Sequence, residues 1–333
     1  MGVRSLVRGS LVAALALSLT GGALAAAAES GASTPDSLAR FTPRDTLSER
    51  LRRPSGVVVD AFGRITVADE ERHSLERFGA DGKWIDGAGA LGSEPAQFRR
   101  PGTLVMLGSL GVAVHDRDNR RVVAYDQHLR LIGIVADFSS EALQSRFGRI
   151  EPVAITADAG GALRVADSDR DRVLAFDFAG GFVSEVGGFG GRAGAFRGLV
   201  AMASLPMGGT ITLERGSLAR RARGKTPDRA AEPARLQWLG ADGRVVRSLG
   251  IDWARAESAR AAIAVDRLGR VALVNAASGE LLLLGRSGER LGAMSGLLNP
   301  SAVAFGPDGA LWVAETGAAR VRSLVIEVLP QAD

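Results

Sequence analysis

A short unit recurs along this chain, and it constrains the fold more than any other feature of the sequence. It reads PSGVVVDAFGRITVAD at 54–69, and it aligns without a gap with PVAITADAGGALRVAD at 152–167 and PSAVAFGPDGALWVAE at 300–315. Diverged copies begin at positions 101, 198 and 260, so successive starts are 47, 51, 46, 62 and 40 residues apart. A sheet-forming repeat of about 40–50 residues is typical of a propeller blade.

Each copy is predicted to form a four-stranded antiparallel meander. In residues 54–98, four short apolar or alternating segments are separated by clusters of turn-forming residues. Tight turns are expected at Asp60–Gly63, Asp158–Gly161, Asp266–Gly269 and Gly306–Gly309, where Asp bonds its own backbone and Gly takes a positive φ. These aspartates are therefore interpreted as structural and not as catalytic carboxylates.

The first copy, its following FGADGK segment and its closing GSEPAQF resemble the NHL repeat, and the copies at 54 and 152 carry the resemblance most clearly. The resemblance extends from about Pro54 to Leu329. It implies an all-β, six-bladed β-propeller of four-stranded antiparallel blades within residues 54–330. It says little about activity, because proteins similar at this level include scaffolds, nucleic-acid binders and a few lyases and hydrolases.

Residues 1–28 are predicted to be a signal peptide. Arg4 and Arg8 form a basic start, 11–19 form a short apolar core, and small residues follow it. The apolar stretch is too short to cross a bilayer, so no membrane span is expected. The mature protein is expected in the periplasm or in the medium. The chain contains no cysteine, and a propeller of this size buries enough apolar surface to fold without disulfides.

Residues 29–53 form a polar lead-in that is expected to close the ring. The last copy supplies three strands but no clear fourth one, and an unpaired edge strand would invite aggregation. We therefore expect Leu38–Thr42, or residues near it, to pair with the last blade. The alternative is a disordered tether, since chain termini are often loose.

A basic insertion, residues 215–235, distinguishes the fourth copy. Glu214 and Leu236 are 22 positions apart, whereas the matching Ala68 and Leu75 are 7 apart, which leaves 15 extra residues. With arginines on the same rim, this segment is predicted to bind an anionic polymer or an acidic protein. The alternative is a solvated excursion. The predicted ligand-binding residues are Arg53, Arg100, Arg197, Arg220, Arg221, Arg223 and Lys225. Nucleic acid is not expected, because the chain is exported and no aromatic residue is interleaved with these arginines.

Four polar residues are candidates for catalysis at the mouth of the channel. Aligning the copies places Glu151 and Asn299 just before two of the first strands, and it places His115 and Glu214 where other copies have a small apolar residue at the end of the second strand. Positions before the first strand and at the end of the second share one rim, where ligand sites often lie. A histidine and an acid there have the chemistry of a general base and acid. Lactonase-like propellers use Glu, Asn and Asp near the channel, which Glu151 and Asn299 match by residue type.

No metal site is expected. Propellers similar to the peptide-amidating lyases place metal-binding histidines around the channel, but the three histidines here, His73, His115 and His128, are not expected to converge. Asp167–Asp171 has alternating carboxylates like the opening of a calcium loop, but it lacks the loop's glycine at the sixth position and its distal Glu. It is interpreted as a hydrogen-bonded turn.

The sequence therefore predicts an exported, monomeric propeller without a cofactor. Its predicted role is a non-enzymatic scaffold that binds an envelope or extracellular protein, or an anionic polymer, through the face with the insertion. The alternative is a propeller hydrolase or lyase with its site in the channel mouth.

Overall fold

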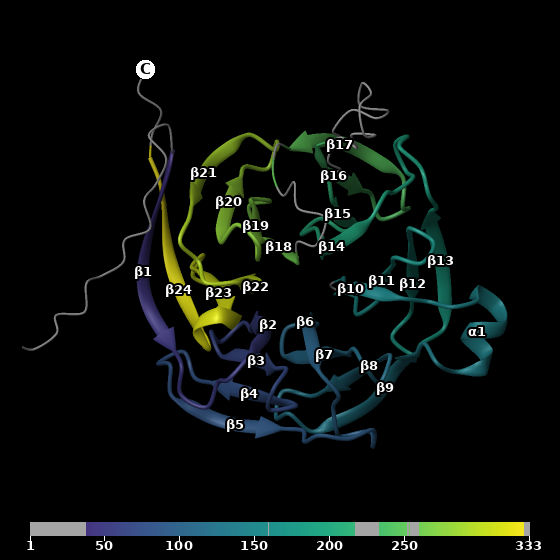
Figure 1. Cartoon of the computed structure of the whole chain (residues 1–333), viewed down its shortest axis with the longest axis horizontal. Helices are drawn as coiled ribbons and strands as arrows, with labels where there is room; N and C mark the ends of the chain where they lie inside the picture. The colour runs from purple at the N-terminus through teal and green to yellow at the C-terminus, as the bar shows by residue number, and fades with distance from the viewer. Residues whose placement is uncertain (1–37, 159, 217–232, 252, 254–259, 330–333) are drawn as a thin grey trace, which may run out of the picture. The chain divides into compact units, whose positions relative to one another are not determined.

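The computed structural model describes residues 38–158, 160–216, 233–251, 253 and 260–329. Six four-stranded antiparallel sheets stand around a central axis as the blades of a β-propeller (Figure 1). The innermost strands β2, β6, β10, β14, β18 and β22 each contact the next, and β22 contacts β2, so the ring is closed. The predicted fold class, an all-β six-bladed propeller, is confirmed.

The strands follow the chain from the axis outward in five of the six blades. The first three blades are β2 (Pro54–Val59), β3 (Ile65–Asp69), β4 (Ser74–Phe78) and β5 (Trp84–Ala88); β6 (Pro101–Leu107), β7 (Gly111–Asp116), β8 (Arg121–Tyr125) and β9 (Leu131–Asp137); β10 (Pro152–Ala157), β11 (Leu163–Asp167), β12 (Arg172–Phe176) and β13 (Phe182–Gly187). The last three are β14 (Leu199–Ser204), β15 (Thr210–Glu214), β16 (Ala234–Leu239) and β17 (Val245–Ile251); β18 (Ala261–Val265), β19 (Val271–Asn275), β20 (Glu280–Leu284) and β21 (Arg290–Met294); β22 (Pro300–Phe305), β23 (Leu311–Glu315), β24 (Arg320–Val328) and β1 (Ala39–Leu47).

The sixth blade takes its outermost strand from the start of the described chain. β1 pairs antiparallel with β24, from Ala39 opposite Val328 to Leu47 opposite Val321, and the two strands run side by side at the left of Figure 1. β1 overlaps the segment expected to close the ring. The last blade therefore has four strands like the other five, and β24 is paired along both of its edges.

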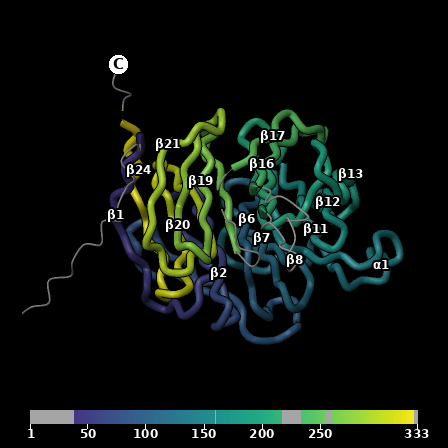
Figure 2. The backbone as a smooth tube through the Cα atoms, turned by 45° about the horizontal axis from the view of Figure 1, so that its top comes forward, coloured from purple at the N-terminus to yellow at the C-terminus, as the bar shows by residue number. Residues whose placement is uncertain are grey.

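The predicted tight turns are confirmed. In the turn between β2 and β3, the Asp60 carboxylate accepts the backbone N–H groups of Phe62 and Arg64 at 2.9 and 3.0 Å. Gly63 has φ +77°, a conformation in which only glycine is free of strain. Such turns keep successive strands short and aligned, so the blades have similar heights around the ring (Figure 2).

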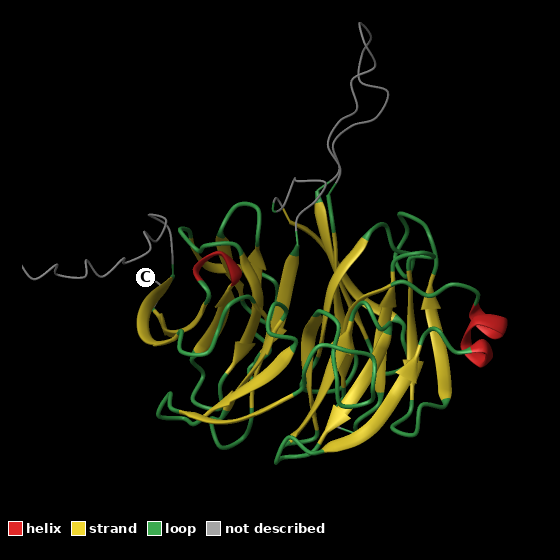
Figure 3. Cartoon of the chain, turned by 60° about the horizontal axis from the view of Figure 1, so that its bottom comes forward, coloured by secondary structure: helices red, strands yellow, loops and turns green. Residues whose placement is uncertain are grey.

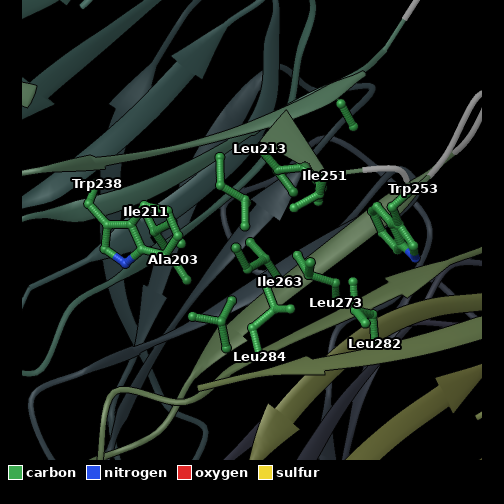
Figure 4. Packing of buried hydrophobic residues seen from close by; sticks show 14 residues of the cluster. Ala203, Ile211, Leu213, Trp238, Ile251, Trp253, Ile263, Leu273, Leu282 and Leu284 are labelled. Atoms are coloured by element: carbon green, nitrogen blue, oxygen red, sulfur yellow. The ribbon is translucent and has the colours of Figure 1, made fainter. Parts of the chain in front are cut away.

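Apolar side chains fill the spaces between neighbouring blades. Between the fourth and fifth blades, Leu213 and Trp238 pack with Ile263, Leu273 and Leu284 (Figure 4). Removing one such side chain to alanine in a packed core costs about 2–5 kcal/mol. The blade-to-blade contact therefore stabilises the ring and fixes the geometry of its axis.

Two short helices lie outside the sheets. α1 (Glu141–Phe147) joins the second and third blades at the outside of the ring, and the 3₁₀ helix η1 (Thr316–Ala318) follows β23 (Figure 3). Phe147 of α1 is buried among residues of these two blades. Within the described ranges, no helix is long and apolar enough to cross a membrane.

Candidate binding site at the channel mouth

The innermost strands enclose a cavity of about 630 Å³ on the propeller axis, lined by residues from all six blades. Its volume falls in the range of pockets that hold small ligands. At the end where the first strands begin, four of its lining residues are arginines, namely Arg100, Arg117, Arg215 and Arg260. This end is the channel mouth, and its residues define the candidate site.

The register of the sheets explains which residues reach the mouth. Each second strand ends in an acidic residue or an asparagine, at Asp69, Asp116, Asp167, Glu214, Asn275 and Glu315. In the second blade, Asp116 accepts the backbone N–H of Arg99 at 2.8 Å and pairs with Arg121 at 2.9 Å. Asp167 makes the same kind of pair with Arg172 at 2.8 Å, which confirms the interpretation of its loop as a hydrogen-bonded turn. These side chains tie the strand ends together.

The next residue in each blade follows at the same end of the sheet, and three of these six residues, Arg117, Ser168 and Arg215, line the cavity. We call this set the mouth ring. Its members are Glu70, Arg117, Ser168, Arg215, Ala276 and Thr316. The sequence reasoning missed this ring because it followed the residue before the acidic end of each second strand. The sequence did contain a signal for it, because each member of the mouth ring directly follows the recurrent Asp, Glu or Asn that ends a second strand.

One buried carboxylate and four arginines meet at the mouth, and Arg100 also lies 3.6 Å from the exposed carboxylate of Asp118. Glu70, only 6% exposed, accepts a hydrogen bond from Arg117 Nη1 at 3.0 Å. Arg53 Nε lies 3.2 Å from the same carboxylate, Arg100 Nη2 lies 3.6 Å away and Arg260 Nη1 lies 3.9 Å away. We call these five residues the Glu70 cluster. Arg260 comes from the fifth blade and Glu70 from the first, so the cluster spans the channel.

The Glu70 cluster carries excess positive charge. Burial lowers the pKa of Arg117, and the nearby charges of Arg260 and Arg100 lower it further, while Glu70 opposes the shift. An arginine stays protonated in a protein, so the repulsion among these four guanidinium groups persists and is only partly balanced by Glu70 and by Asp118 beside Arg100. Arg215 adds another cation to the cavity lining. The mouth is therefore a region of positive electrostatic potential.

Two glycines make room for the arginines of the mouth ring. A Cβ on Gly102 would collide with the Arg117 guanidinium, and a Cβ on Gly198 would lie 2.6 Å from Arg215 Nε. Gly102 also brings its carbonyl oxygen against Gly56, so the first and second blades approach closely here. The arginine side chains can lie along the backbone only because these positions lack side chains.

His115 lies in the channel wall, as the sequence placed it. It is 3% exposed, it lines the cavity, and its Nδ1 atom has no hydrogen-bond partner among the described residues. Burial, with a smaller contribution from the charge of Arg117, lowers the pKa of His115 to about 3. His115 is therefore neutral at physiological pH and adds no charge to the mouth.

The alignment of the fourth copy was wrong by one residue, and this changes the place of Glu214. Leu199 pairs with Glu214 as Pro54 pairs with Asp69, so the copy begins at Leu199 and not at Gly198. Glu214 is buried at the end of β15, where it pairs with Arg235 at 2.6 Å and accepts a hydrogen bond from Gln237 at 2.8 Å. It is a counterpart of the strand-ending acids and does not line the cavity.

A separate one-residue error, in the opposite direction, had placed Arg197 at the position of Arg100. Gly198, with φ +64°, takes that position, where Arg100 has φ +56°. The backbone N–H of Arg197 donates to Glu214 at 2.8 Å, and its guanidinium lies 6.0 Å from the Phe189 ring centre. Arg197 therefore does not line the cavity, and its backbone is bonded to the fourth blade through Glu214.

The other predicted residues are spread over the rim. The Glu151 carboxylate is bonded to Arg149 at 2.9 Å and is 45% exposed, and Asn299 precedes β22 with φ +51°. Neither is among the residues that line the cavity.

In the part of the chain that is described, no three His, Asp, Glu or Cys side chains gather as metal ligands do. The predicted binding residues Arg220, Arg221, Arg223 and Lys225 lie outside the described residues, as does the predicted signal peptide at 1–28.

The fold and the site thus define a six-bladed β-propeller with a cationic channel mouth. Among solved structures, the chain is similar to a gluconolactonase from Xanthomonas campestris (13% identity, TM-score 0.58, 87% of this chain and 90% of that one). It is also similar to virginiamycin B lyase from Staphylococcus aureus (11%, 0.56, 86% and 99%) and to a streptogramin B lyase (10%, 0.54, 87% and 97%). At these identities the likeness shows the fold alone. No protein-family profile and no curated protein sequence matches the chain, so the NHL resemblance is not confirmed.

Proposed function

We propose that this protein is an exported binding propeller that takes an anionic ligand at the mouth of its central channel. One observation carries the proposal: arginines from the first, second and fifth blades converge on a single buried carboxylate at the end of an axial cavity. Preassembled guanidinium groups bind carboxylate and phosphate groups through charge-assisted hydrogen bonds. The basic insertion leaves from the same face through Arg215, which lines the cavity, so it supports the same role.

The test is anion binding by the purified mature chain. Phosphate and acetate are titrated by calorimetry at low ionic strength, where electrostatic binding is strongest. Arg117→Gln should weaken binding about tenfold or more, because a hydrogen bond to a charged group contributes about 1.5–3 kcal/mol. Arg130→Gln is the matched control, since Arg130 is an exposed arginine of the same blade outside the cavity. Equal binding by both variants and the unmodified chain would overturn the proposal.

A hydrolase or lyase reaction in the channel mouth is the second candidate. It is supported by the fold shared with a gluconolactonase and two streptogramin-type lyases, and by a neutral imidazole, His115, in the cavity wall. A histidine with a pKa of about 3 is a weak general base at neutral pH, so the binding role is favoured. Turnover of a lactone or cyclic ester panel that is lost in His115→Ala and kept in His128→Ala would support catalysis.

A further inference from the structure

We infer that the ligand of the channel mouth is amphipathic, with one anionic head group at the Glu70 cluster and an apolar body inside the channel. This inference rests on the proposed function, because it specifies which anions the mouth takes. It is carried by a second observation, the chemistry of the channel wall below the arginines.

The wall below the mouth carries apolar side chains from every blade. The innermost strands place aliphatic, thioether and aromatic side chains along the cavity, contributed by all six blades. Examples are Val59, Met106, Val153, Val200, Val265 and Phe305. Within the described part of the chain, all the charged residues of the cavity lining are the four arginines at the mouth. Apolar walls gain free energy when an apolar group replaces water against them.

Most hydroxyl groups of the wall are already hydrogen-bonded within the protein. Ser55 Oγ donates to the carbonyl oxygen of Pro101 at 2.6 Å, and Ser301 Oγ donates to that of Pro54 at 2.8 Å. Thr156 and Ser204 are bonded to each other at 2.9 Å. A polar ligand body, such as a sugar, would lose its water and find few free donors in this wall, which is unfavourable. An apolar body has no such cost.

The position of the charges fixes the orientation of the ligand. The arginines come from residues before the first strands and after the second strands, so they lie at one end of the cavity. A molecule with a single anionic group would place that group at the mouth and its remaining atoms along the axis. The cavity of about 630 Å³ has the size expected for a whole small molecule and not for a polymer strand.

The test uses a series of straight-chain carboxylates from acetate to octanoate, each kept below its micelle concentration. Calorimetry should show an affinity that rises about fourfold for each added methylene, the factor expected when one CH₂ group is buried. The heat capacity change should become more negative along the series, which marks apolar burial. All members should lose affinity in Arg117→Gln.

A pair of isosteric variants locates the apolar body. Val153→Thr adds a hydroxyl to the channel wall in β10 and should weaken octanoate about fivefold or more while leaving acetate unchanged. Val183→Thr is the matched control, because Val183 is an exposed residue of β13 in the same blade. Arg117-dependent binding with equal affinity for all chain lengths would overturn the inference and leave the proposed function standing. Absence of binding by every carboxylate and by phosphate would overturn both.

Discussion

Glu70→Gln removes the carboxylate around which the four arginines gather. In the folded chain, Glu70 lies 3.0 Å from Arg117 and within 3.9 Å of three further guanidinium groups. It occupies the position that an external anion would otherwise take. Neutralising it should therefore have two opposite effects, a less stable unliganded protein and a stronger affinity for anions.

The magnitudes follow from the geometry. Two unit charges at about 4 Å interact by about 1 kcal/mol in bulk water and by about 4 kcal/mol near a protein surface. Arg53, Arg100 and Arg260 are about half exposed, so the lower part of this range applies. We expect the free energy of unfolding to fall by about 1–2 kcal/mol. Relief of the repulsion between Glu70 and a bound anion should tighten binding by a similar amount, about 5–30-fold.

Both effects are measured on the same samples. Urea unfolding followed by circular dichroism gives the stability, and calorimetric titration with phosphate at low salt gives the affinity. Glu71→Gln is the matched control, because Glu71 lies 3.9 Å from Arg52, is 56% exposed and does not line the cavity. If Glu70→Gln weakened phosphate binding, Glu70 would be part of the binding surface and our account of the excess charge would be refuted.

Three further predictions follow from the site. Gly102→Ala should displace the Arg117 guanidinium and weaken phosphate binding about tenfold in calorimetry, and an unchanged affinity would show that Arg117 is not needed. Glu214→Ala should lower the free energy of unfolding by about 3 kcal/mol in urea, because it leaves Arg235 without its carboxylate; a loss below about 1 kcal/mol would contradict a structural role. His115→Ala should flatten the pH dependence of stability. The folded pKa of about 3 lies below the usual 6.5, so the unfolded state binds more protons between these values and stability falls as pH falls from 6.5 to 3. Urea curves at several pH values test this, and an unaltered slope would exclude His115 as its source.

The sequence predicted the architecture because the repeat carries it. Three copies align without gaps, and their turns need Asp and Gly at fixed positions, so the number of sheets could be counted from the chain. The strand that completes the last blade could also be anticipated at β1, since that blade otherwise lacks a fourth strand. These features depend on local turn and strand propensities, which can be read directly from the residue types.

The site was only partly predictable. Arg53, Arg100 and His115 were found because they occupy aligned positions of the repeat. Glu70 and Arg117 were missed because they follow the last residue of a second strand. A one-residue error in locating the strand end changes which side chains are assigned to the mouth. The fourth copy shows the problem, since its one-residue shift made Glu214 resemble a channel residue.

The most direct test of the central claim is a crystal of this protein soaked in selenate, with the anomalous signal of selenium used to locate the anion. The account predicts a peak at the channel mouth within hydrogen-bond distance of Arg117 and of at least one other arginine of the Glu70 cluster. An empty mouth, with peaks only at exposed arginines elsewhere on the propeller, would contradict it.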